Sequence, residues 1–108
     1  MVLVNERRTS ERKRILLEAK WESLSRQHEA RVDDVSLGGC FVNTYAKAEL
    51  EEEVNLEIRL PSGEWLALRG KVASYQPGVG FGMSFSALSE NESAALKELI
   101  ASAKEHTL

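Results

Sequence analysis

Apolar and polar residues alternate along most of this chain, and this period of two is the feature that most restricts its fold. In the segment 15–24, Ile15, Leu17, Ala19 and Trp21 fall on one side, and charged residues fill most of the other. Successive side chains of a strand point to opposite faces, so the pattern predicts a strand with one buried face. Similar patterns predict further strands over about 30–35, 40–42, 54–60, 64–75 and 79–85.

Glycine and tryptophan positions add detail to the predicted sheet. Glycine weakens a strand and often marks a bend, so Gly80 and Gly82 indicate a corner of a barrel rather than a ligand contact. Trp21 and Trp65 are assigned to packing within the barrel rather than to ligand binding. The predicted turns between strands are Leu37-Gly38-Gly39, Pro61-Ser62-Gly63, which makes a hairpin of its two neighbouring strands, and Gln76-Pro77-Gly78.

Only the C-terminal segment has the periodicity of a helix. Ser89 followed by Glu92 is a capping box, and Leu96, Leu99, Ile100 and Ala103 recur at helical spacing. The fold class is therefore all-β with a C-terminal helix: a small six-stranded antiparallel β-barrel with the helix packed on it. We expect a single domain made of a flexible basic N-terminal arm (1–14), the barrel (15–86) and the helix (87–108).

The net charge of −3 conceals an uneven distribution. Residues 1–14 carry five basic and two acidic side chains, a net charge of +3, whereas residues 15–108 carry nine basic and fifteen acidic side chains, a net charge of −6. Nucleic-acid binding uses a broad positive face, so DNA and RNA are not expected partners. The arginines of the arm suit a small anion instead, because a guanidinium group matches phosphates and guanine edges. The run Glu51-Glu52-Glu53 is interpreted as a solvated loop.

Several classes of protein are disfavoured by what the chain lacks. It has no apolar run approaching the ~20 residues of a transmembrane helix, and residues 1–8 have the wrong charge order for a signal peptide, so we expect a bacterial cytoplasmic protein without membrane insertion. Cys40 is expected to pack as a small apolar side chain. His28 and His106 have no motif that would pair with it in catalysis or metal binding. We therefore expect no enzyme, no metal and no cofactor.

Two short clusters are the candidates for function. Arg8 and Arg12 lie four residues apart just before the first predicted strand, and Asp34, Ser36 and Gly39 form an Asp-x-Ser-x-x-Gly sequence at the end of another. Taken alone, the arginines would be solvated, and the second cluster would be local turn chemistry, with carboxylate and hydroxyl groups bonding nearby backbone N–H groups.

Together, in this order and on this scaffold, the clusters resemble the PilZ domain family, whose signature is Arg-x-x-x-Arg followed about twenty residues later by Asp/Asn-x-Ser-x-x-Gly. The segment from Gly80 to Phe85 also resembles the late Gly-x-Gly-hydrophobic-x-Phe strand of that family, so the similarity spans roughly residues 6–100. The resemblance implies a receptor for the bacterial second messenger cyclic di-GMP.

The chemistry of the matched residues agrees with that ligand. An arginine fork pairs with the O6/N7 edge of guanine, and Asp34 can accept from guanine N1–H and N2. Ser36 can donate or accept at short range, and Gly38-Gly39 lets the backbone approach a ligand. The ligand-binding residues implied by the resemblance are Arg7, Arg8, Arg12, Asp34, Ser36, Gly38 and Gly39.

Arg7 and two departures from the family pattern refine this expectation. An arginine at the position of Arg7 resembles members that take a stacked, intercalated pair of cyclic di-GMP molecules rather than one. Many members carry a tryptophan near the end of the long fifth strand, where this chain has Tyr75, so either Tyr75 substitutes for it or the contact is absent. The loop before Val54, often glycine-containing, is here rich in glutamate.

Three functions remain as alternatives. The first is a cyclic di-GMP receptor that reorders its arm on binding and signals through an unidentified effector protein, since no effector domain is expected in the chain. The second is a PilZ-type protein-interaction module that binds no nucleotide. The third, a small barrel for single-stranded nucleic acid, is disfavoured because such proteins need a basic groove with exposed aromatic residues.

Overall fold

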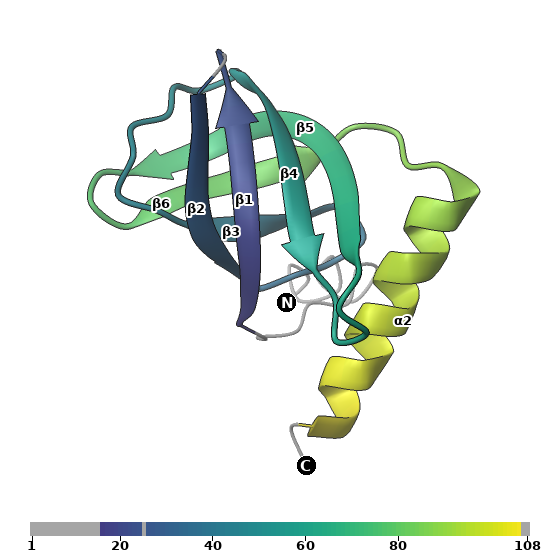
Figure 1. Cartoon of the computed structure of the whole chain (residues 1–108). Helices are drawn as coiled ribbons and strands as arrows, with labels where there is room; N and C mark the ends of the chain where they lie inside the picture. Colours follow the sequence, from purple (N-terminus) through teal and green to yellow (C-terminus); the bar gives the residue numbers. More distant parts are fainter. Residues whose placement is uncertain (1–15, 25, 107–108) are drawn as a thin grey trace, which may run out of the picture.

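Six strands form a closed antiparallel barrel in the order β1-β2-β3-β6-β5-β4, with β4 pairing back onto β1 (Figure 1). The computed structural model describes residues 16–24 and 26–106. The barrel and its helix confirm the predicted fold class. The elements are β1 (Leu17–Ser23), β2 (Arg26–Asp33), β3 (Gly39–Asn43), β4 (Glu53–Arg59), β5 (Trp65–Gln76), β6 (Gly80–Phe85) and α2 (Glu90–His106).

The barrel interior is filled by the apolar residues of each alternating strand. Trp21 has the largest of these side chains and is only 2 % exposed. Its ring stacks on His28, with ring centroids 4.4 Å apart, and meets the edge of Phe81 at 5.0 Å, so the packing role predicted for it is confirmed. Trp65 packs on the outside of the barrel instead of in its interior: it begins β5, is 36 % exposed and lies against Lys20 and Arg59. The other buried strand residues are Ala19, Val32, Cys40, Val42, Val54, Leu56, Ile58, Leu68, Val72 and Met83.

The second strand differs most from its prediction. It was expected over about 30–35 but covers Arg26–Asp33, because it pairs along the whole of β1, from Ser23–Arg26 to Leu17–Val32. Its first residues are polar and therefore lack the alternation that sequence analysis detects. Backbone hydrogen bonds to β1 hold them as a strand. The strand ends at Asp33 because Asp34 adopts a left-handed conformation with φ of 56°.

The interpretation of Gly82 as a bend residue agrees with an irregularity between β5 and β6. Val72 pairs with Met83, but the next pair is Ser74 with Gly82, so β5 carries one extra residue at this point. A Cβ atom added at Gly82 would lie 2.6 Å from Ser74 Oγ. The glycine therefore lets the two strands meet at the bulge, which bends the strand as barrel closure requires.

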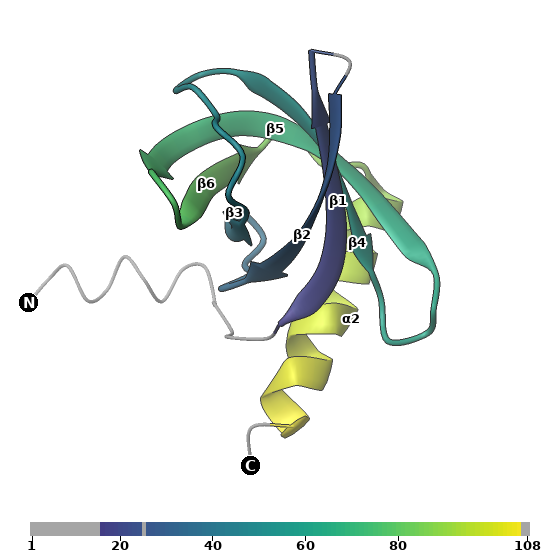
Figure 2. The ribbon, with the colours of Figure 1, turned by 60° about the vertical axis from the view of Figure 1, so that its left-hand side comes forward.

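The C-terminal helix α2 begins with the predicted capping box. The Ser89 N–H donates to Glu92 Oε1 at 2.9 Å, and the Glu92 N–H donates to Ser89 Oγ at 3.1 Å. Leu96, Leu99 and Ile100 are buried in the same core as the barrel interior. Figures 1 and 2 show the later turns of the helix extending past the end of the barrel. Across the described residues, no helix is long and apolar enough to cross a membrane.

Candidate functional site

The Asp-x-Ser-x-x-Gly sequence forms a tight turn between β2 and β3, with Ser36 at its centre. The Ser36 side chain is buried, and its Oγ accepts the N–H groups of Gly38 at 3.1 Å and Gly39 at 3.3 Å. The Ser36 backbone N–H donates to the Gly39 carbonyl at 2.9 Å, and its hydroxyl donates to the same oxygen at 3.3 Å. The hydroxyl of Ser36 therefore fixes the shape of the turn.

The two glycines of the turn have different surroundings. A Cβ atom at Gly39 would collide with the carbonyl oxygen of Met83 on the neighbouring strand and lie 3.2 Å from its carbon. A Cβ at Gly38 would meet only Ser36 Oγ, at 3.9 Å. Gly38 is exposed, and its carbonyl accepts the N–H of Phe85 at 2.9 Å. Gly39 is thus required by strand packing, whereas Gly38 is the glycine that presents backbone to solvent.

The structure brings four of the predicted site residues together in this one turn. Asp34 is half-buried, and its left-handed backbone reverses the chain at the end of β2. Ser36, Gly38 and Gly39 follow within five residues. The other predicted residues lie outside the described residues: Arg7, Arg8 and Arg12. That these arginines lie beside the Asp34 turn therefore remains a prediction.

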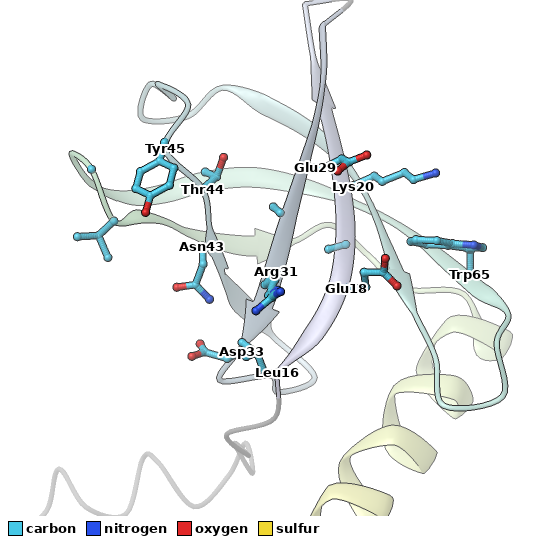
Figure 3. A pocket seen from close by; sticks show the side chains of 14 residues that line it. Leu16, Glu18, Lys20, Glu29, Arg31, Asp33, Asn43, Thr44, Tyr45 and Trp65 are labelled. Carbon is cyan, nitrogen blue, oxygen red and sulfur yellow. The ribbon is translucent and has the colours of Figure 1, made fainter.

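A depression of about 830 Å³ lies on the outer face of the barrel beside this turn, and we call it the outer depression (Figure 3). Leu16 and Asp33 line one end, Tyr45 lines the other, and Trp65 lies at the side toward β4 and β5. Val79 also lines the depression, and its carbonyl accepts the N–H of Thr44, the neighbour of Tyr45. Leu16 is the residue before β1, so the arginine-bearing segment joins the barrel at this end.

The strand register explains why polar side chains gather on this face. Arg31 pairs with Asn43, and Asp33 pairs with Phe41. Directly opposed residues of neighbouring strands share a face, so these four side chains point outward while Val32 and Val42 fill the core. Arg31, Asp33 and Asn43 thus line the outer depression with a cation, a carboxylate and an amide.

The electrostatics of the outer depression are mixed rather than uniformly positive. The cations Lys20 and Arg31 lie among the carboxylates Glu18, Glu29 and Asp33. Such a lining suits a ligand with both hydrogen-bond donors and acceptors, such as a nucleobase, better than a bare phosphate. The described residues hold no cluster of three or more His, Cys, Asp or Glu side chains that could bind a metal ion.

Sequence reasoning missed the residues of the outer depression. The alternation within 30–35 was a usable signal, because it already places Arg31 and Asp33 on the face opposite Val32. The alternation of β5 likewise places Trp65 on the face opposite Leu66, Leu68 and Val72. No comparable signal existed for Tyr45, which follows β3 in a loop.

Comparison with known proteins agrees with this architecture. Residues 6–102 match the family model of the PilZ domain. The crystal structure of the PilZ domain of CeSA from a cellulose-synthesizing bacterium superposes with a TM-score of 0.69 at 18% identity, covering 87% of this chain and 98% of that one.

A second solved structure has the same fold within a larger protein. The structure of the Bacillus subtilis inhibitor of motility (MotI/DgrA) superposes with a TM-score of 0.72 at 15% identity over 94% of this chain. This chain spans about half of that protein, 51% of its length. Sequence comparison with curated proteins gives no significant match.

Proposed function

Because this chain belongs to the PilZ domain family, we propose that it is a receptor for cyclic di-GMP that changes conformation on binding and signals through a partner protein. The observation that carries the proposal is the extent of the family match. It covers residues 6–102 and so includes both the arginine pair and the Asp34 turn.

The position of the Asp34 turn supports the proposal. Asp33, next to Asp34, lines the same end of the outer depression as Leu16. Leu16 is four positions after Arg12, and a fully extended chain of that length spans about 14 Å. Covalent connection therefore sets an upper limit of about 14 Å between the Cα atoms of Arg12 and Leu16, which supports the proposal that the arginine contacts a ligand at this end of the depression.

In the proposed complex each residue type has a distinct task. Arg8 and Arg12 would bind phosphate or the guanine O6/N7 edge, and Asp34 would accept hydrogen bonds from guanine N1–H and N2. Gly38, whose N–H and carbonyl are already bonded within the fold, would let the ligand approach its exposed Cα closely. Ser36 would act through the turn, because its hydroxyl is already engaged by Gly38 and Gly39.

Calorimetric titration of the purified full chain with cyclic di-GMP tests this function. We expect wild-type protein to bind with micromolar or tighter affinity, and Arg8→Ala and Asp34→Ala to lose measurable heat while keeping the wild-type circular dichroism spectrum. Cyclic di-AMP, which lacks guanine O6 and N2, is the control ligand and should bind far more weakly. No heat from wild-type protein would reject the proposal.

The same titration reports on Arg7. A stacked pair of nucleotides is the proposed ligand form, because the Arg7 guanidinium can stack on a guanine face or bridge to phosphate. A stoichiometry near two nucleotides per chain supports this form, and a stoichiometry near one rejects it.

One observation favours a second candidate, a PilZ-type protein-interaction module that binds no nucleotide. Turn formation and strand packing alone account for Ser36 and Gly39, so these two residues do not require a ligand. This candidate predicts that Arg8→Ala and wild-type protein behave alike toward cyclic di-GMP.

A further inference from the structure

Exposed apolar side chains gather in the outer depression. Six large apolar residues are exposed among those described, and Leu16, Tyr45, Trp65 and Val79 line this one feature. Single exposed apolar residues are normal on protein surfaces, but a group of them beside polar groups marks a binding site. The two aromatic members lie at different places, with Tyr45 beyond the end of β3 and Trp65 at the start of β5 (Figure 3).

The Trp65 ring already has two cationic partners. Lys20 Nζ lies 4.7 Å from the ring centroid, and Arg59 Cζ lies 5.3 Å from it. Arg59 is also paired with Glu18, with 3.7 Å between Nη1 and Oε1. A base that stacked where these cations lie would have to displace them.

Tyr45, in contrast, has an exposed side chain on a fixed stretch of backbone. It is 91 % exposed, yet the backbone on both sides of it is held. The Thr44 N–H donates to the Val79 carbonyl at 3.2 Å, and the Ala46 N–H donates to Thr44 Oγ1 at 3.3 Å. Ordering such a residue on binding costs little backbone entropy, because its main chain is already fixed.

The second tyrosine of the chain is not available in this way. Tyr75, which occupies the position where many family members have tryptophan, is partly buried and packs against the hydrophobic core. Tyr45 is therefore the tyrosine whose ring can accept a planar ligand.

We propose that Tyr45 is a base-stacking residue that covers one guanine of the bound cyclic dinucleotide at the end of the outer depression opposite Asp33. This inference rests on the proposed function and adds a residue to that site. Each cyclic di-GMP carries two guanines, so whether one nucleotide or a stacked pair is bound, a first guanine at the Asp34 turn leaves at least one other to be held elsewhere. Arg31 and Asn43 lie between the two ends, where they can bond the polar edges of the sugar–phosphate ring.

The strand geometry sets the distance that the ligand must span in the proposed complex. The pair Asp33–Phe41 and the pair Arg31–Asn43 are two residues apart along the strands, a step of roughly 7 Å. Tyr45 lies a further two residues along the chain. Because Tyr45 follows the end of β3, a ligand reaching from Asp33 to Tyr45 covers more than one such step, a span that suits two linked bases better than one mononucleotide.

Affinity measurements on two variants test the stacking role. Stacking on an aromatic ring is worth about 1–3 kcal/mol per base on replacement by alanine, so Tyr45→Ala should weaken cyclic di-GMP binding roughly 5- to 150-fold. Tyr45→Phe keeps the ring and should stay within about twofold of wild type. Leu50→Ala, an exposed apolar residue outside the depression, is the matched control and should bind as wild type does.

A spectroscopic measurement separates stacking from an indirect effect. In protein carrying isotope-labelled tyrosine, the Tyr45 ring signals should move upfield on addition of cyclic di-GMP, because a stacked base shields them. Tyr75 serves as the internal reference and should move less. GMP, with a single base, should leave Tyr45 less shifted at an equal occupancy of the Asp34 turn.

The outcomes distinguish this inference from the function on which it rests. Wild-type binding that is unchanged in Tyr45→Ala, or an unmoved Tyr45 signal at saturating ligand, overturns the stacking role and leaves the receptor function standing. A loss of affinity equal in Tyr45→Ala and Tyr45→Phe also overturns it, since the ring would not be the cause. Absence of binding by wild-type protein overturns both.

Discussion

The two adjacent glycines of the Asp34 turn are expected to respond to substitution in opposite ways. A methyl group at Gly39 meets the backbone carbonyl of Met83, and neither strand can move without breaking the β3–β6 pairing. Overpacking against backbone leaves no flexible side chain to give way, so Gly39→Ala should lower the free energy of unfolding by about 3 kcal/mol or more. Urea denaturation followed by the fluorescence of buried Trp21 measures this loss.

Gly38→Ala is the matched control for that substitution. Its Cβ would make only an ordinary contact with Ser36 Oγ, and its φ lies outside the left-handed region. Alanine there reduces the entropy of the unfolded chain, so stability should stay the same or rise by up to about 1 kcal/mol. Equal losses in the two variants would contradict the assignment of Gly39 to strand packing.

At the residue scale, sequence predicted that four of the candidate residues are neighbours but not the structural task of each one. Asp34, Ser36, Gly38 and Gly39 do meet in one turn, because their order along the chain is itself the turn. The difference between Gly38 and Gly39 was invisible, since it depends on Met83, a residue far along the chain that the barrel brings alongside. Tyr45 was missed for the same reason: its exposure is a property of the folded surface.

At the scale of elements, the start of α2 carries a prediction of its own. Ser89 and Glu92 satisfy each other's backbone N–H groups, and the helix they begin contributes three buried side chains to the core. Ser89→Ala leaves the Glu92 N–H without its side-chain acceptor and should lower the free energy of unfolding by about 1 kcal/mol. Chemical denaturation of the full chain provides the measurement.

A substitution in the same turn of the helix controls for local effects. Asn91 is exposed in the first turn of α2, so Asn91→Ala should change stability by no more than about 0.5 kcal/mol. Alanine favours a helix more than asparagine does, so if Asn91→Ala were as destabilising as Ser89→Ala, the loss in Ser89→Ala could not be assigned to the cap.

Element boundaries were predictable where pattern and pairing agreed. The strands β4, β5 and β6 lie within one or two residues of their predicted ranges because apolar alternation and turn residues mark both ends. The strand β2 was predicted poorly because Arg26 to Glu29 are held by pairing to β1, which no local pattern records. The outward position of Trp65 follows from the same alternation, because Leu66, Leu68 and Val72 form the buried face of β5 and Trp65 falls on the other.

For the whole molecule, the distribution of charge favours the binding of a small anionic ligand over that of a polymeric one. The segment 1–14 has a net charge of +3 and the rest of the chain −6. A cyclic dinucleotide contacts a few residues and needs only a local group of arginines. A nucleic acid tracks along the surface and would meet the acidic body, whose repulsion acts over about 8 Å at physiological ionic strength.

The full chain should therefore discriminate strongly between these anions. A fluorescein-labelled single-stranded 20-nucleotide DNA, followed by anisotropy at physiological salt, should show no saturation up to about 100 µM, the weak end of non-specific binding. Replacing the exposed residues Glu49, Glu51 and Glu53 by lysine changes the net charge of the body from −6 to 0, and should bring DNA binding into range. Those residues lie outside the outer depression and the Asp34 turn, so the affinity for cyclic di-GMP should change little. Tight DNA binding by the wild-type chain would contradict this prediction. It would show that the basic segment 1–14 outweighs the negative charge of the rest of the chain, so that this acidity does not select a dinucleotide over a nucleic acid.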